Sequence, residues 1–360
     1  PLQTCPRCGQ ENYLIDIRCK RCGESLLKDS NPKQLDAYSA SLQPIQDVVQ
    51  RYLGDYTLLQ LVKVNGPGTT YTVEKNHQRY VLKHLDASKY NGTAVSQGMF
   101  LSECEALSSL SHPGLPEVVK YLAQGSNFFL LLDCTKGKSL QEYLYPGTMS
   151  DGVRPNTKPT LPKIERVIRW AIELAEALRY LHEQKPFPIP HRGLNPLTVM
   201  ITQSTGYVRL ADFGLLNSFR AAASHAEDGL VSFHADVFAD PQLLGKNWPD
   251  PRTDIYAFGK ILDFMLTRVV PTELGSPLSF PRVATMQDDK MRSSLVDILT
   301  RCCQKSPAKR YQNMDALLAD LARLSSEDGA HEDHPVRCSC GHLNPSNSKS
   351  CQQCGLLLQR

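Results

Sequence analysis

Four cysteines lie within the first 22 residues of this 360-residue chain, and four more lie within the last 23. At each end they form two close pairs separated by ten residues, and a glycine follows the second cysteine of every pair. The two ends therefore carry one module used twice. A segment of about 25 residues buries too little apolar surface to fold alone, so each end needs a metal ion or disulfide bonds.

The spacing favours a tetrahedral zinc site with four thiolate ligands at each end. The glycines permit turns with positive φ, which let backbone N–H groups approach the sulfurs. Disulfide staples are the alternative; the absence of a secretory signal and the four further cysteines in the middle of the chain favour zinc. Four thiolates leave no open position for chemistry, so both Zn²⁺ ions are expected to be structural. The modules resemble zinc ribbons with rubredoxin-type knuckles, and the expected ligands are Cys5, Cys8, Cys19, Cys22, Cys338, Cys340, Cys351 and Cys354.

Charge and aromatic content indicate which partners the ribbons suit. The first ribbon has five basic and three acidic residues with Tyr13 as its only aromatic, and the second has three basic residues and no aromatic. Binding of single-stranded nucleic acid requires aromatic platforms in a basic groove, so docking on a protein or a structural role is favoured. The net charge of +3 indicates no polyanion partner. No apolar run is long enough to cross a bilayer, so a cytoplasmic protein without a membrane span is expected.

Composition divides the chain into five parts. Residues 31–50 are polar with two prolines and are typical of a linker, with a short helix before Arg51 left open. Residues 325–335 form a second, acidic linker. The expected organisation is a ribbon at 1–28, a linker at 29–50, a large domain at 51–325, a linker at 326–336 and a ribbon at 337–360.

The large domain begins with strand-like runs and ends with helical patterns. Residues 56–85 contain two β-like runs around a Gly-rich segment and a further run, and residues 128–132 form a short buried strand. Apolar spacing predicts an amphipathic helix over 164–182, and residues 254–266 are apolar enough for a helix buried on all sides. This order predicts an α+β, two-lobed fold.

Seven features occur in order along residues 51–324: GPGTTYTV at 66–73, Lys83 in YVLK, Glu103, LDCT at 132–135, DFG at 212–214, Asp254 in DIYAFG, and Arg310. Their order and spacing resemble those of a protein kinase. The resemblance implies that the Gly-rich loop, the strand lysine, its helix glutamate, the hinge and the DFG aspartate bind ATP with Mg²⁺. It also implies that Asp254 braces the catalytic loop and that Arg310 serves the end of the activation segment. The implied nucleotide-site residues are Gly66, Gly68, Lys83, Glu103, Asp133, Thr135 and Asp212.

The catalytic loop departs from the kinase pattern. The aspartate that accepts the substrate's proton is replaced by Gly193, the usual lysine by Asn195, and the second metal-binding asparagine by Thr198. His191 and Arg192 are retained. Loss of a general base alone costs about 10²–10⁴ in rate, which predicts a pseudokinase rather than an enzyme.

Three other departures bear on the site. Tyr71 stands where the family has its third glycine, and it is expected to hinder phosphates if it folds into the cleft. The activation segment ends in Asp240, Pro241 and Gln242, so at best a neutral hydrogen bond is expected to replace the ion pair with Arg310. Cys104, Cys134, Cys302 and Cys303 are expected to be small buried side chains.

The sequence supports three hypotheses of function. The first is a pseudokinase that acts as a scaffold or allosteric regulator of a signalling protein, with nucleotide binding left open. The second is a divergent ATP-dependent phosphotransferase or nucleotidyltransferase that uses the same cleft. The third is a nucleic-acid-binding adaptor that uses the ribbons. Serine/threonine kinases with cysteine-rich ends occur in bacteria, notably cyanobacteria, and this chain resembles an inactive relative of them.

Overall fold

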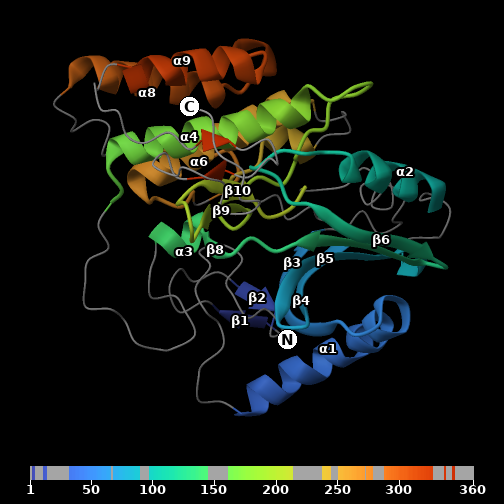
Figure 1. Ribbon diagram of the computed structural model, residues 1–360. Coiled ribbons are helices and arrows are strands. Elements are labelled where there is room, and N and C mark those ends of the chain that lie inside the picture. Colours follow the sequence, from blue (N-terminus) through green and yellow to red (C-terminus); the bar gives the residue numbers. More distant parts are fainter. Residues whose placement is uncertain are drawn as a thin grey trace.

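The computed structural model describes residues 2–4, 11–13, 32–65, 68–89, 97–144, 161–213, 237–244, 250–271, 273–278, 288–326, 336–337 and 343–344. These residues form a β-sheet lobe followed by a helical lobe, with the five-stranded sheet in the lower part of Figure 1 and helices α4 (Ile164–His182), α6 (Arg252–Thr267), α8 (Asp289–Cys302) and α9 (Met314–Ser326) in the upper part. The predicted α+β, two-lobed class is therefore confirmed.

The first lobe is built on a five-stranded antiparallel sheet with the order β3-β4-β5-β7-β6. Helix α2 follows β5 and packs on β6. Strand β6 forms the edge of the sheet, and β7 lies between β6 and β5 and pairs with both. The expected strand at 128–132 is the centre of β7. The elements are β3 (Thr57–Asn65), β4 (Gly68–Lys75), β5 (Gln78–Asp86), α2 (Gln97–Ser108), β6 (Val118–Gln124) and β7 (Asn127–Asp133).

Side chains that alternate along the strands enter two separate cores. Leu85 and Leu130 point toward the helical lobe and join the main core of the molecule. Leu82 and Leu131 point to the opposite face and join a second cluster. The sheet is thus buried on both faces, which explains why β7 reads as a continuous apolar run.

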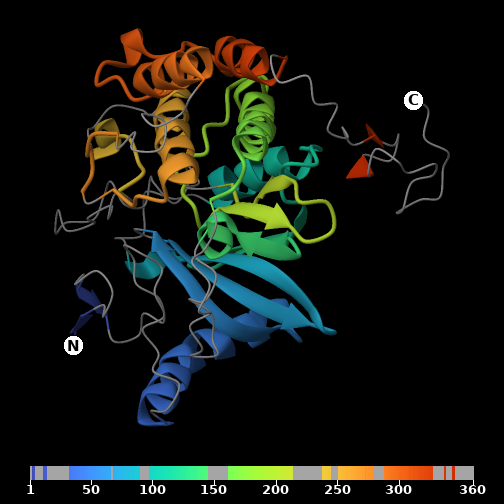
Figure 2. The ribbon, with the colours of Figure 1, turned by 90° about the vertical axis from the view of Figure 1, so that its left-hand side faces the viewer.

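The outer face of the sheet is covered by α1 (Pro32–Leu53). Figure 2 shows the sheet lying between α1 and the helical lobe. Within the part of α1 whose side chains are described, Leu42, Ile45, Val49 and Leu53 share one helical face and pack in the second cluster. The expectation of a linker over 29–50 is therefore wrong from Pro32 onward, because this apolar stripe gains its burial from the sheet.

A side chain of α1 also bonds to the sheet backbone. The Gln46 amide donates to the Tyr56 carbonyl at 3.1 Å, and its oxygen accepts from the Leu58 N–H at 2.6 Å. Tyr52 stacks at a tilt against Phe129 with ring centroids 5.8 Å apart. Because these bonds reach both α1 and β3, the helix is a fixed part of the lobe.

The second lobe is a helical layer with a small sheet. Helices α4 and α6 cross its centre, and α9 packs on α4 while α8 packs on α6 (Figures 1 and 2). The predicted helix at 164–182 matches α4. The elements are β8 (Gly137–Ser139), α3 (Leu140–Leu144), α4 (Ile164–His182), β9 (Val199–Thr202), β10 (Val208–Leu210), α6 (Arg252–Thr267), α8 (Asp289–Cys302) and α9 (Met314–Ser326), with short 3-10 turns at Ala87–Lys89, Pro241–Leu244 and Pro307–Lys309.

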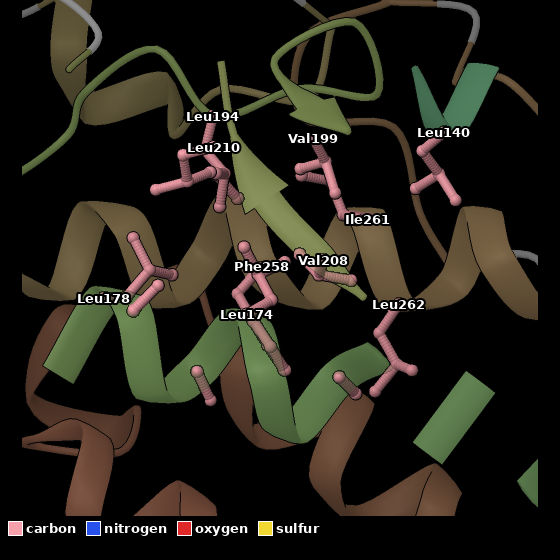
Figure 3. Packing of buried hydrophobic residues seen from close by; sticks show 14 of the residues in the cluster. Leu140, Leu174, Leu178, Leu194, Val199, Val208, Leu210, Phe258, Ile261 and Leu262 are labelled. Carbon is pink, nitrogen blue, oxygen red and sulfur yellow. The ribbon is translucent and has the colours of Figure 1, made fainter. Parts of the chain in front are cut away.

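The core of this lobe lies between α4, α6 and the β9–β10 hairpin. Figure 3 shows Leu174 of α4 below Phe258 of α6, with Val208 of β10 to the side of Phe258. All residues of α6 from Thr253 to Leu266 are buried, as the sequence predicted for a helix covered on every side. The hairpin is held in register by antiparallel pairing, which fixes the backbone that precedes Asp212.

Helices α6 and α8 come very close at Gly259. A Cβ at this position would lie 2.6 Å from the Cys302 Cβ and 2.7 Å from the Cys303 Sγ, so only glycine fits. Cys104 and Cys302 are buried and Cys303 is half-buried, as expected for small core side chains. Burial raises the pKa of Cys303 to about 12, which keeps the thiol protonated.

At the two ends of the chain, only short hairpins are described. The strand β1 (Leu2–Thr4) pairs with β2 (Glu11–Tyr13), and β11 (Val336–Arg337) pairs with β12 (Leu343–Asn344), both antiparallel. The eight cysteines predicted to bind zinc all lie outside the described residues. Within the part of the chain that is described, no cluster of His, Cys, Asp and Glu suits a metal ion, and no helix is long and apolar enough to cross a bilayer.

Candidate active site

Lys83 and Asp212 meet between the two lobes. Lys83 lies in β5, Asp212 follows β10, and their Nζ and Oδ2 atoms are 3.0 Å apart. Both side chains are almost fully buried, with 3% and 8% of their surface exposed. The arrangement places one cation and one hard oxygen ligand side by side.

The catalytic loop is fixed from below by Asp254, as the sequence predicted. The Asp254 carboxylate accepts the backbone N–H of His191 at 2.6 Å and of Arg192 at 2.8 Å, and the His182 Nε2 lies 2.8 Å away. Burial works to raise the pKa of Asp254, but the hydrogen bond and charge of His182 together with the other contacts hold it below its usual value. The carboxylate therefore remains ionised and grips the loop.

His191 links this loop to Asp212. Its Nε2 lies 3.0 Å from the Asp212 carbonyl oxygen and 3.5 Å from the Asp212 carboxylate. Complete burial lowers the pKa of His191, so the ring is neutral and its Nε2–H donates to the carbonyl. His191 is fully buried, and Leu107 and Phe213 are buried in the main core.

The substituted positions of the loop bond to one another. The Asn195 Oδ1 accepts the N–H groups of Leu197 at 2.8 Å and of Thr198 at 3.1 Å. The Thr198 hydroxyl accepts the Asn195 N–H at 3.0 Å and lies within bonding distance of the carbonyls of Asn195 and Gly193. Because the side chains of Asn195 and Thr198 are buried and make these hydrogen bonds, they stabilise the conformation of the loop.

The sheet register decides where Tyr71 points. Tyr71 pairs with Leu82 and Thr70 pairs with Lys83, so Thr70 shares the cleft face with Lys83. Tyr71 lies on the outer face, buried in the second cluster under α1. The condition under which Tyr71 would hinder phosphates is therefore not met, because adjacent residues of a strand point to opposite faces of the sheet.

The hinge between the lobes is formed by Asp133, Cys134 and Thr135. The Asp133 N–H is already bonded to the Glu117 carbonyl at 3.0 Å. Thr135 is buried, with 8% of its surface exposed, and its hydroxyl has no hydrogen-bond partner among the residues that the structure describes. Burial raises the pKa of Cys134, which leaves a weakly reactive thiol.

The remaining predicted nucleotide-site residues are only partly described. Glu103 lies half-buried in α2, and Gly68 is buried at the start of β4. Gly66 lies outside the described residues. Of the predicted set, the structure thus brings Lys83 and Asp212 into direct contact.

The end of the activation segment is joined to the core by an ion pair. The Arg310 guanidinium donates to both carboxylate oxygens of Asp240, at 2.5 and 3.1 Å, and both side chains are fully buried. Gln242 is exposed and its amide donates to the Lys305 carbonyl instead, at 3.4 Å. The expectation of a neutral hydrogen bond at best is therefore wrong, because an acid two residues earlier provides the charge.

Sequence reasoning also missed Arg209 of β10. Its guanidinium donates to both oxygens of Asp133, at 2.7 and 3.2 Å, across 76 residues of sequence. Arg209 stands at no motif position of the family, and Asp240 stands at the alanine position of the A-P-E motif, where no acid is expected. The only available signal was that each is a charged residue beside a buried, apolar run.

A five-stranded antiparallel lobe joined to a helical lobe, with a buried lysine–aspartate pair between them, defines a two-lobed protein kinase-like fold. The chain belongs to the protein kinase domain family, which it matches over residues 66–321, more than half of its length. The family match begins after α1, so this helix lies outside it.

Relatives and solved structures agree with this assignment. The chain is 25% identical over 292 residues to a probable serine/threonine-protein kinase of Clostridium perfringens, covering 78% of this chain and 40% of that protein. It is 26% identical over 289 residues to a serine/threonine-protein kinase of Myxococcus xanthus, covering 76% and 33%. In fold it is similar to the crystal structure of the PknI kinase domain of Mycobacterium tuberculosis, with a TM-score of 0.51, 20% identity, and 75% and 96% coverage.

The comparisons contradict the prediction that the domain is not an enzyme. The matched family is that of protein kinases, and the similar proteins from Clostridium and Myxococcus carry the name of serine/threonine kinases. Gly193 remains a departure from the family's catalytic loop, but one missing group does not set the class of the protein. The chain spans two fifths or less of the length of these relatives.

Proposed function

We propose that the domain is an ATP-dependent phosphotransferase that acts on serine or threonine hydroxyls of a protein. The observation that carries this proposal is the buried contact of 3.0 Å between Lys83 and Asp212. The lysine cation suits the phosphates of a nucleotide, and the carboxylate suits Mg²⁺, which prefers oxygen ligands. The serine/threonine preference comes from the names of the relatives.

Two features of the site fit ATP and Mg²⁺. The unpartnered hydroxyl of Thr135 lies buried at the hinge, where a bound adenine would give it a partner. His191 contacts Asp212 twice, at its backbone carbonyl oxygen and at its carboxylate Oδ1. These contacts fix the direction of the other carboxylate oxygen, Oδ2. When bound to Asp212, Mg²⁺ would offset the negative charge on the phosphate oxygens. Tyr71 faces away and leaves the cleft face to Thr70 and Lys83.

The proposed reaction proceeds without a carboxylate base at Gly193. The substrate hydroxyl oxygen bonds to the γ-phosphorus, the bond to the β–γ bridging oxygen breaks, and ADP leaves. Phosphoryl transfer depends mainly on positioning and charge, so the hydroxyl proton can leave late, to a phosphoryl oxygen or to water. Without the base, turnover is expected about 10²–10⁴ below the roughly 1–100 per second of typical kinases.

Transfer of label from γ-labelled ATP tests the proposal. The full chain is incubated with Mg²⁺ or Mn²⁺ and with a serine/threonine peptide library, and label in protein and peptide is counted. We expect slow transfer that is lost in Lys83→Met and Asp212→Asn and retained in Arg179→Met, which alters an ion pair between α4 and α9. No transfer by the unaltered chain contradicts the proposal. Incorporation of α-label instead would identify a nucleotidyltransferase.

We also propose that each end of the chain is a zinc ribbon, at residues 1–28 and 337–360. The antiparallel pairs β1–β2 and β11–β12 support this, because the first cysteine pair of each module lies in sequence between two paired strands. Elemental analysis of the purified chain should find two zinc ions, and Cys5→Ser and Cys338→Ser should each lose one. Disulfide bonds in a zinc-free chain would contradict the proposal.

A further inference from the structure

A bidentate ion pair connects the hinge to the strand that leads into Asp212. Asp133 is the last residue of β7, and Arg209 is the middle residue of β10. The Arg209 Nη1 donates to the Asp133 Oδ2 at 2.7 Å and the Nη2 to the Oδ1 at 3.2 Å. The two side chains are 23% and 18% exposed, so the pair is shielded from solvent on most sides. Fork-to-fork pairs of this kind fix orientation as well as distance.

Both partners are held by further bonds to the segment between α2 and β6. The Arg209 Nε donates to the Leu115 carbonyl at 3.0 Å. The Asp133 carboxylate accepts the Glu117 N–H at 2.6 Å, and the Asp133 N–H donates to the Glu117 carbonyl at 3.0 Å. Neither side chain can turn without breaking several bonds, so the pair is ordered at little additional entropy cost.

Backbone hydrogen bonds connect this ion pair to the residues around Asp212. The Leu210 N–H donates to the Gly114 carbonyl and the Ala211 N–H donates to the Thr198 carbonyl, each at 2.8 Å. Asp212 follows immediately, and Thr135 lies two residues after Asp133. One short chain of bonds thus joins the hinge, the catalytic loop and the aspartate beside Lys83.

We infer that Asp133 and Arg209 are positioning residues that form a latch between hinge and β10 and set the distance from the hinge to Asp212. This inference rests on the proposed function, because a bound ATP would reach from the hinge, at its adenine, to Asp212, at its phosphates. With the latch formed, the cleft is preorganised and nucleotide binding need not first order the hinge. The latch itself is a property of the protein without nucleotide, and it is tested separately.

Amide hydrogen exchange tests the latch, and calorimetric titration with ATP and Mg²⁺ tests its effect. In the full chain, Asp133→Asn and Arg209→Met should each increase exchange at the amides of Asp133 and Leu210 about tenfold and weaken ATP binding about tenfold. Because each variant breaks the same pair, the double variant should be no weaker than either single one. Arg209→Lys keeps the charge but loses the fork, so it should not restore binding.

Arg179→Met is the matched control, since it removes an arginine–aspartate contact of 3.5 Å between two elements of one lobe. It should leave ATP affinity and hinge exchange unchanged. Additive effects of the two single variants, or full restoration by Arg209→Lys, would overturn the latch. So would unchanged exchange, whatever the nucleotide result. If the unaltered chain binds no ATP, the proposed function fails, and the exchange data alone decide whether the latch exists.

Discussion

Arg310 and Asp240 form a fully buried, two-pronged ion pair that joins the end of the activation segment to the start of the last helical region. The Arg310 Nη1 also donates to the Arg252 carbonyl at 2.9 Å, at the beginning of α6. The ring of Tyr256 lies below the guanidinium, 4.9 Å from its carbon. Although the family's glutamate is Gln242 here, the chain keeps the charge pair by supplying the acid from a neighbouring position.

The first prediction concerns this pair. Asp240→Ala leaves the Arg310 charge buried without its partner, and breaking a buried pair in this way costs about 3–5 kcal/mol of unfolding free energy. Gln242→Ala, at the family's own position, should cost less than about 0.5 kcal/mol because its side chain is exposed. Urea unfolding of both variants measures the difference. Equal losses in the two variants would show that Asp240 has not taken over the anchoring role.

The second prediction concerns α1. Leu53→Ala removes an apolar side chain from the cluster that contains Tyr71 and Leu82, and should cost about 2–5 kcal/mol. The exposed Gln50→Ala on the same helix is the control and should be nearly neutral.

Deletion series test the same helix as a unit. Removal of residues 1–31 should leave the cooperative unfolding of the sheet lobe intact, whereas removal of residues 1–53 should expose the outer face of the sheet and lower the melting temperature sharply. A chain that melts at the same temperature with and without α1 would show that the segment is a linker after all.

The third prediction is a pH dependence that arises from Glu173 of α4. Burial raises the pKa of this carboxyl to about 8, despite the hydrogen bond that it accepts from the Val208 N–H at 2.8 Å. In the unfolded chain the Glu173 carboxyl has its usual pKa of 4.5, so between this pH and about 8 only the folded state keeps the proton. The free energy of unfolding therefore falls as the pH rises from about 4.5 to about 8. The loss is on the order of a few kcal/mol.

Glu173→Gln removes this dependence because an amide does not ionise and its oxygen can still accept from Val208. The difference in melting temperature between the variant and the unaltered chain should grow in favour of the variant between pH 5 and pH 8. Glu176→Gln, on the exposed side of the same helix, should show no such trend. A constant difference across this pH range would contradict a raised pKa at Glu173.

The fourth prediction concerns the catalytic loop. Gly193 is not one of the described glycines with a positive φ angle, so an aspartate can adopt its backbone conformation. Gly193→Asp would supply a general base and should increase the rate of phosphotransfer by about 10²–10⁴ without changing ATP affinity. Gly193→Asn has nearly the same shape and cannot act as a base, so it should leave the rate unchanged. Equal rates in both variants would show that proton removal does not limit the reaction.

The local parts of this protein could be predicted because neighbouring residues decide them. The apolar spacing over 164–182 and the apolar run over 254–266 gave α4 and α6 closely, since a helix is stabilised by bonds within itself and by a continuous apolar face. Lys83, Asp212 and Asp254 could be placed at one site because their order along the chain is that of a known fold.

The enzyme class was predicted wrongly for a related reason. The three replacements in the catalytic loop, Gly193, Asn195 and Thr198, were weighed as if they decided the class, whereas the whole of residues 66–321 carries the family relationship. The zinc ligands and the domain boundaries at the two ends remain predictions.

By itself, the sequence determined the kinase order of strands and helices, the position of the lysine–aspartate site and the burial of α6. Only the tertiary structure decided that residues 32–53 are a helix on the sheet, that Tyr71 faces that helix, and that Arg310 and Arg209 find Asp240 and Asp133. The reason is physical. The burial of a helix face, the direction of a strand side chain and the partner of a charged group each depend on residues far away in the sequence. These interactions stabilise the protein only once the fold has brought those residues together.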